Sequence, residues 1–229
     1  MGIDYTKKSG PSGPPRTSGG SAAGPAKLTL TKTERRVDLA KRGERQGVMR
    51  VNLNWTNPQP AQKKTGFFAK LLGVGGGVDL DLGCLYELAD GSTGVIQALG
   101  RSYGDAHKPP YIALDRDDRT GAVSGGENLH INLADPAAFR RILIFAMIYE
   151  GAPNWAAVDG VVTMFPTSGP QVEVRLDSAV DGARICAVAL LTAADGGLTV
   201  QREVEYISGS QADLDRAYQW NMRWAAGRK

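Results

Sequence analysis

The chain has few of the residues most used in catalysis and in metal–sulfur chemistry: only two of its 229 residues are cysteines and two are histidines. Cys84 and Cys186 lack the Cys-x-x-Cys spacing of a zinc site and both occur in apolar, strand-like runs, so we expect reduced, buried thiols. His107 and His130 fit no His-x-x-x-His or Ser/His/Asp pattern, and each is interpreted as a solvated side chain. We assign no catalytic residue and expect the chain not to be an enzyme.

Long apolar runs are also absent. No run approaches the roughly twenty residues of a transmembrane helix, so no transmembrane segment is predicted. The first residues contain no apolar core of a signal peptide, which favours a cytoplasmic protein. The net charge of +3 is modest and does not favour a nucleic-acid partner. The apolar content of 42% is sufficient for a full hydrophobic core.

Composition divides the chain into two parts. Residues 1–26 are rich in glycine, proline and serine, and such a segment cannot bury enough apolar surface to offset its ordering entropy. We therefore predict a disordered N-terminal tail at 1–26 and one folded domain at 27–229.

Period-two alternation predicts half-buried strands at residues 49–55 and 78–88, and the continuous apolar run at 142–149 predicts a central strand. Further strands are predicted at residues 161–165, 172–176, 183–191 and 198–206. Many short strands separated by turn signals indicate an all-β fold, an antiparallel sandwich of two sheets, rather than a βαβ fold.

Two segments carry helix-start signals. Asp135-Pro136 is typical of an N-cap and first helical position, and predicts one or two helical turns through Arg141. Residues 210–213 resemble a capping box, which predicts a C-terminal helix extending to Ala226.

Two acidic stretches are the main functional signal. Alternation in the strand at 78–88 places the carboxylates of Asp79 and Asp81 on one face, away from the core. A glycine-rich loop follows more than thirty residues later, and its glycines let backbone carbonyls turn inward at little steric cost. Calcium binds several oxygen ligands, so the two stretches are interpreted as halves of one calcium site. The candidate ligands are Asp79, Asp81, Asp115, Asp117, Asp118 and Glu127. The alternative is that both stretches are solvated polar segments.

The same stretches carry a family resemblance. Val78-Asp79-Leu80-Asp81, the block at residues 114–121 and the run at 148–155 are similar to those of the TerD family of tellurite-resistance stress proteins, and most closely to its TerA-like branch. The resemblance spans residues 28–224. It implies a TerD-like β-sandwich domain that binds Ca²⁺, takes part in a bacterial stress response linked to tellurite resistance, and has no established enzymatic activity.

The chain departs from that family at one point. Members usually carry several more aspartates between the Arg-Thr-Gly and the glutamate, whereas residues 122–126 hold no carboxylate. We therefore expect one calcium ion rather than two. The resemblance further implies action through partners, namely other tellurite-resistance family proteins, with a membrane-associated complex as one option.

Two other functions are compatible with the same residues. A C2-like calcium-dependent adaptor would use bound calcium to bridge the acidic loops to an anionic membrane surface. A carboxylate-dependent hydrolase would use a pair such as Asp117 and Glu127. The tips of the loop offer only Ala122 and Val123 for membrane contact.

Overall fold

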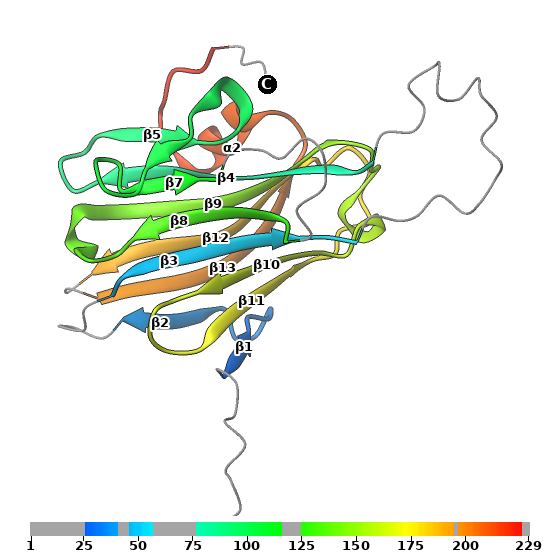
Figure 1. The fold of residues 1–229 in the computed structure, drawn as a ribbon. Coiled ribbons are helices and arrows are strands. Elements are labelled where there is room, and N and C mark those ends of the chain that lie inside the picture. Colours follow the sequence, from blue (N-terminus) through cyan, green and yellow to red (C-terminus); the bar gives the residue numbers. More distant parts are fainter. Residues whose placement is uncertain (1–25, 41–45, 57–76, 116–124, 195–196, 226–229) are drawn as a thin grey trace, which may run out of the picture.

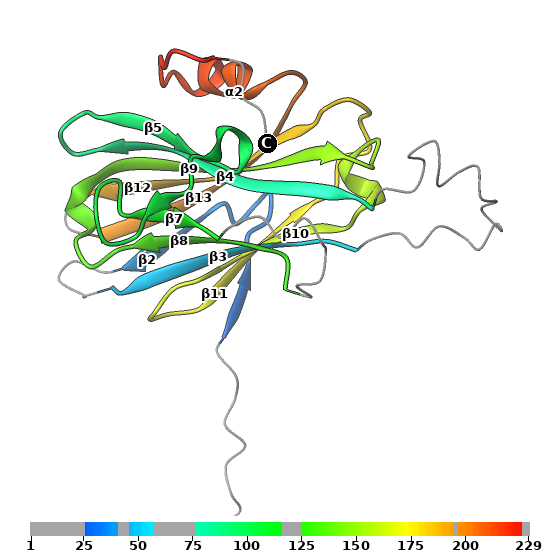
Figure 2. The same ribbon diagram turned by 45° about the horizontal axis from the view of Figure 1, so that its top comes forward.

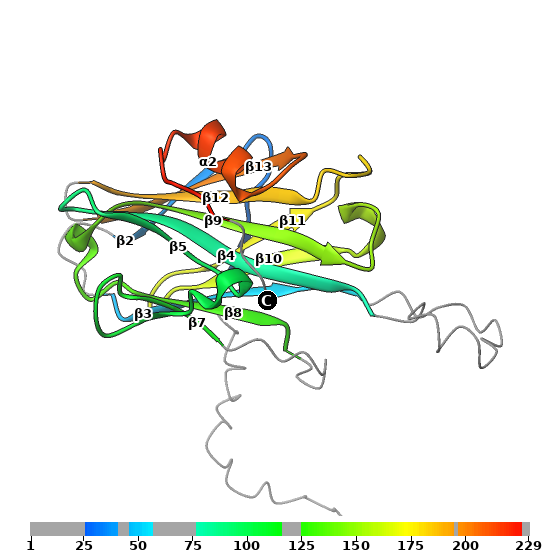
Figure 3. The ribbon, with the colours of Figure 1, turned by 90° about the horizontal axis from the view of Figure 1, so that it is seen from above.

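The structure is a computed structural model, and it describes residues 26–40, 46–56, 77–115, 125–194 and 197–225. Within these residues two β-sheets face one another, as seen from above in Figure 3. The predicted all-β sandwich is therefore confirmed. The predicted tail, residues 1–26, lies outside the described residues except for Ala26.

The first sheet has seven strands (Figure 1). In spatial order they are β1 (Lys27–Thr29), β11 (Gln171–Leu176), β10 (Gly160–Phe165), β3 (Val48–Asn54), β8 (Glu127–Asn132), β7 (Ile112–Leu114) and β6 (Gly104–Asp105). Of the strand pairs that the described residues form in this sheet, only β1–β11 is parallel. In β3, Met49, Val51 and Leu53 are buried, as the alternation predicted.

The second sheet has six strands, all antiparallel. In spatial order they are β2 (Arg36–Ala40), β13 (Gly197–Ile207), β12 (Ile185–Ala194), β9 (Phe139–Glu150), β4 (Asp79–Leu88) and β5 (Thr93–Ile96). The apolar run at 142–149 lies within β9, between β12 and β4, so the predicted central strand is confirmed.

The helical turn predicted after Asp135 is shorter than expected. The Asp135 carboxylate accepts a hydrogen bond from the N–H of Ala137 at 3.1 Å, and a 3₁₀ helix, η2, covers Pro136–Ala138. The prediction that it continues through Arg141 is wrong, because β9 begins at Phe139 and Arg141 pairs with Glu87 of β4. Two further 3₁₀ helices are η1 (Leu99–Arg101) and η3 (Trp155–Ala157).

Helix α2 (Gln211–Tyr218) begins with the predicted capping box, in which the N–H of Ser210 donates to Asp213 Oδ2 at 2.8 Å. The predicted extension to Ala226 is wrong, because Gln219 adopts the left-handed conformation with φ of 56° and ends the helix. Helix α2 lies over the outer face of the six-stranded sheet (Figure 2).

In the described part of the chain, the buried apolar residues form two clusters. The main cluster fills the space between the sheets and includes both cysteines, which are free and buried as predicted. The second cluster lies on the α2 side of the six-stranded sheet. Its buried members are Leu85, Leu143, Phe145, Ile185, Ala187, Leu214 and Trp220. Among the described residues, no helix is long and apolar enough to cross a membrane.

Candidate functional site

Glu127, the first residue of β8, connects the two sheets. Its Oε2 atom accepts a hydrogen bond from the backbone N–H of Leu82 on β4 at 2.5 Å. Strand β5 pairs only with residues 84–87 of β4, so the N–H of Leu82 lies on a strand edge beyond the end of β5. The bond therefore satisfies a backbone donor that has no strand partner and brings a carboxylate from the acidic loop to the Asp79-Leu80-Asp81 segment.

Gly126 and Asn52 hold Glu127 in this position. Gly126 has φ of +69°, and a Cβ atom there would overlap the backbone carbonyl of Leu53. The Nδ2 atom of Asn52 donates to the carbonyl of Gly125 at 2.5 Å and lies 3.0 Å from Asn128 Oδ1. Asn52 was missed by the sequence reasoning, because it looks like any polar residue in an alternating strand.

Asp79 and Asp81 lie on β4 as predicted, with Leu80 and Leu82 pointing into the main core. Alternation puts Asp81 on the same face as Leu85, which belongs to the second cluster. This face was expected to be open, but Asp81 is only 2% exposed and Asp79 is half-buried. Near Asp81 this face is covered, because Met147, which stands opposite Asp81 on β9, packs against the second cluster.

Asp115 lies in a different environment. Its side chain is 54% exposed, and its Oδ1 atom is 3.0 Å from Nε2 of His130. His130 alternates with the buried Leu129 and Ile131, so this pair lies on the outer face of the seven-stranded sheet. Glu127 instead reaches the six-stranded sheet, and the structure thus places the two carboxylates on opposite sides of β8.

The remaining two predicted ligands, Asp117 and Asp118, lie outside the described residues. Among the residues that are described, no three His, Cys, Asp or Glu side chains come together closely enough to hold a metal ion. The described donors alone therefore do not complete a calcium site. Completing one would require oxygen ligands from residues 116–124.

Among the described residues, the histidine–carboxylate pair does not extend into a catalytic arrangement. A base needs a nucleophile within hydrogen-bond reach. Within the described part of the chain, no serine, threonine or cysteine side chain hydrogen-bonds to His130. The backbone N–H of His107 donates to Asp105 Oδ1 at 2.6 Å.

The ionisable groups whose pKa is shifted take part in contacts that join different elements of the fold. The hydrogen bond from Arg141 lowers the pKa of Glu87, and Arg140 adds to the effect. Burial raises the pKa of Tyr218, as do the nearby carboxylates of Glu203 and Glu205. Arg141 also stacks 3.8 Å from the ring centroid of Trp220 and donates to the carbonyl of Tyr218 at 3.0 Å, which fixes the end of α2 to the sheet.

The described geometry defines a class of protein: an all-β sandwich with a helix on one face and carboxylates at one end of strands β4 and β8. No family model matches the chain. The tellurium resistance protein TerA of Alcaligenes sp is 40% identical over 204 residues, which cover 89% of this chain and 59% of that protein. This similarity supports a Ter-family assignment, of the TerD-like type, and the resemblance found in the sequence is confirmed.

The chain spans about three-fifths of the length of that relative. A solved crystal structure, described as the unknown function protein SAV2460, has a TM-score of 0.46 and 16% sequence identity to this chain. That match covers 74% of this chain and 94% of the other.

Proposed function

We propose that this chain is a calcium-binding stress-response protein linked to tellurite resistance, which acts through protein partners and not by catalysis. Its similarity to a tellurium resistance protein supports the link to tellurite. The observation that carries the calcium assignment is the hydrogen bond from Leu82 to Glu127, because it joins the two acidic stretches across the sandwich.

The ends of the acidic loop support the same assignment. The N–H of Asp115 donates to the carbonyl of Asn128 at 2.9 Å, and the carbonyl of Gly125 accepts from Asn52. Both ends of the segment 116–124 are thereby tied to the seven-stranded sheet. Asp117 and Asp118 follow Asp115 by two and three residues, and each residue of chain spans at most about 3.6 Å, so their reach is limited to this end of the sandwich.

The charges explain why a cation would be needed. Several carboxylates gathered without a cation repel one another, and a bound ion removes that repulsion. Calcium accommodates irregular sets of oxygen ligands, whereas magnesium demands near-octahedral geometry and dehydrates reluctantly. Calcium should therefore raise the thermal midpoint by mass action, and magnesium should raise it less.

Calcium titration by calorimetry tests the proposal. The wild-type protein should bind one ion per chain. The double variant Asp79→Asn/Asp81→Asn and the single variant Glu127→Gln should each bind at least about tenfold more weakly, since each lost charged ligand is worth roughly 1.4 kcal/mol or more. Glu127→Gln keeps an acceptor for Leu82, so it separates loss of charge from loss of the bond between sheets.

Asp90→Asn is the matched control. Asp90 is an exposed carboxylate in the turn after β4, at the far end of the strand from Asp79, and it hydrogen-bonds only to Ser92 among the described residues. Its substitution should leave the calcium affinity unchanged. A double variant that keeps the wild-type affinity would mean that the two stretches do not form one site. Calcium-dependent sedimentation with anionic vesicles would instead favour a membrane adaptor.

A further inference from the structure

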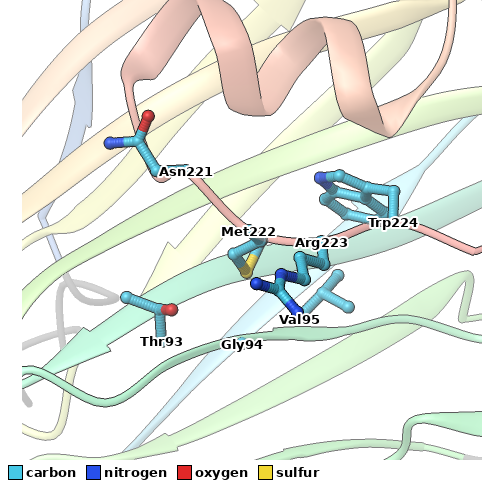
Figure 4. Close-up of a pocket in the computed structure, with 7 residues that line it drawn as sticks. All are labelled: Thr93, Gly94, Val95, Asn221, Met222, Arg223 and Trp224. Atoms are coloured by element: carbon cyan, nitrogen blue, oxygen red, sulfur yellow. The ribbon is translucent and has the colours of Figure 1, made fainter.

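A groove runs between the edge strand β5 and the segment that follows α2. Figure 4 shows this segment, residues 221–224, passing beside Thr93, Gly94 and Val95. Two hollows of about 390 and 580 Å³ share Val95, Arg223 and Trp224 in their linings. One hollow continues to Thr93 and the other to Gln97. We call this continuous depression the β5 groove.

One wall of the β5 groove is held in place by Asp215. This carboxylate is 4% exposed. It accepts hydrogen bonds from the N–H of Asn221 at 2.7 Å, the N–H of Met222 at 2.9 Å and the indole Nε1 of Trp224 at 2.6 Å. Three donors on one buried acceptor fix the segment without any ligand, so a partner would not have to order this wall on binding.

The other wall offers backbone hydrogen-bonding groups. In the β4–β5 hairpin, the N–H of Leu88 donates to the carbonyl of Ser92. Because backbone direction alternates along a strand, the N–H and C=O groups of the even-numbered residues of β4 point toward β5. Val95 stands opposite Leu85, an odd residue, so its N–H and C=O point away from β4. The carbonyl of Val95 accepts from Ser102 Oγ at 2.6 Å, but no described residue accepts from its N–H. By the same alternation, the N–H and C=O of Thr93, which also lines the groove, point away from β4.

The charge that lines the β5 groove is positive. Arg223 is the only charged side chain that lines either hollow within the described part of the chain, and no described carboxylate pairs with it. The undescribed segments 1–25, 57–76 and 226–229 each contain more basic than acidic residues, so their charge opposes binding beside Arg223. Charge complementarity therefore favours an acidic occupant from another molecule.

We propose that the β5 groove binds an extended acidic segment of a partner protein, which joins the edge of β5 as an additional strand. The N–H of Val95 would donate to a backbone carbonyl of the partner, as in other strand-addition complexes, and a carboxylate of the partner would pair with Arg223. Met222 and Trp224, both partly buried against the second cluster, supply the apolar contact. None of the predicted calcium ligands lines the groove, so this interaction does not depend on the proposed calcium site.

Fluorescence anisotropy tests the charge requirement. The probe is a labelled, end-capped eight-residue peptide that alternates valine with glutamate, titrated against the full chain in EDTA. Arg223→Glu should weaken binding about tenfold, because an attraction is replaced by a repulsion at an exposed position. A probe with lysine in place of glutamate should bind at least tenfold more weakly to the wild-type protein. Lys32→Glu, an equal charge change in the connection between β1 and β2, should have no effect.

Two N-methylated versions of the acidic probe test the strand pairing. One is methylated at its odd residues and the other at its even residues, so that each blocks one edge of the peptide. One version should lose binding and the other should retain it, and the amide signal of Val95 should shift on binding of the active version. Binding that is unaffected by both methylations, that is unchanged by Arg223→Glu, or that fails to saturate by millimolar probe would overturn the proposal. Tighter, Arg223-dependent binding of a DNA oligonucleotide would overturn it in favour of a nucleic-acid site.

Discussion

Asp215 should be among the most sensitive positions of the C-terminal region. Its buried carboxylate is the common acceptor for two backbone N–H groups and one indole N–H from residues 221–224. Asp215→Ala removes all three bonds at once and leaves the donors without a protein partner. We expect the segment to detach from the sheet and the free energy of unfolding to fall by about 3 kcal/mol.

The magnitude follows from the surroundings of each donor. A hydrogen bond to a charged group contributes roughly 1.5–3 kcal/mol, so the complete loss of three such bonds would lower the free energy of unfolding by more than the expected value of about 3 kcal/mol. Asn221 is exposed and Met222 and Trp224 are only partly buried, so water can replace much of what is lost. Asp215→Asn retains one acceptor oxygen and should cost about half as much as the alanine variant.

Urea denaturation followed by tryptophan fluorescence and by circular dichroism measures the effect. Asp213→Ala is the control on the same helix, because Asp213 is more exposed and serves only the capping box and an exposed ion pair with Arg216. Its loss should cost about 1 kcal/mol. If Asp215→Ala lowers the free energy of unfolding by no more than this control, the three hydrogen bonds do not anchor the segment and the reasoning is refuted.

Three further outcomes follow from the structure. Burial raises the pKa of both Cys84 and Cys186, so thiol labelling should be slow in the native protein and complete in denaturant; rapid native labelling at either position would contradict the packing. Arg141 holds the pKa of Glu87 below its usual 4.5, so the stability contributed by this carboxylate is complete above about pH 5 and is lost as the pH falls through the lowered pKa. Glu87→Gln should therefore flatten the acid side of the plot of unfolding free energy against pH, and an unchanged plot would exclude this ion pair as a cause of acid sensitivity. Gly126→Ala should destabilise the fold by more than about 1 kcal/mol and weaken calcium binding, because its φ is positive and a Cβ would strike the carbonyl of β3; a variant with wild-type melting would show that the loop adjusts freely.

The long strands were predictable because their patterns are local. The runs that became β3, β4 and β9 carry either strict alternation or continuous apolar character. Strands β6 and β7 have two and three residues, too few for any period to appear, and they form through pairing with β8 and with each other. The end of α2 was not predictable either, since the left-handed Gln219 carries no glycine signal.

The candidate site likewise has features that a local sequence pattern predicts and features that it does not. Alternation alone placed Asp79 and Asp81 on one face of their strand. The burial of Asp81 depends on tertiary contacts of that face, where Met147 of β9 and Leu214 of α2 belong to the second cluster, and no local pattern encodes these contacts. The separation of Asp115 from Glu127 likewise depends on the side of β8 that each one occupies, and the sequence places both in one acidic loop.

Helix α2 covers the outer face of only one of the two sheets, and this asymmetry affects where the molecule unfolds locally. Strand β9 lies between the two buried clusters, with Ile142 and Ile144 in one and Leu143 and Phe145 in the other. Its amides are therefore shielded from solvent on both sides. The seven-stranded sheet carries Asn52, Asn128 and His130 on its outer face and lacks a second layer there among the described residues. Local opening is easiest where fewest apolar contacts must be broken, so hydrogen exchange should spread inward from the open sheet and reach the amides of β9 last.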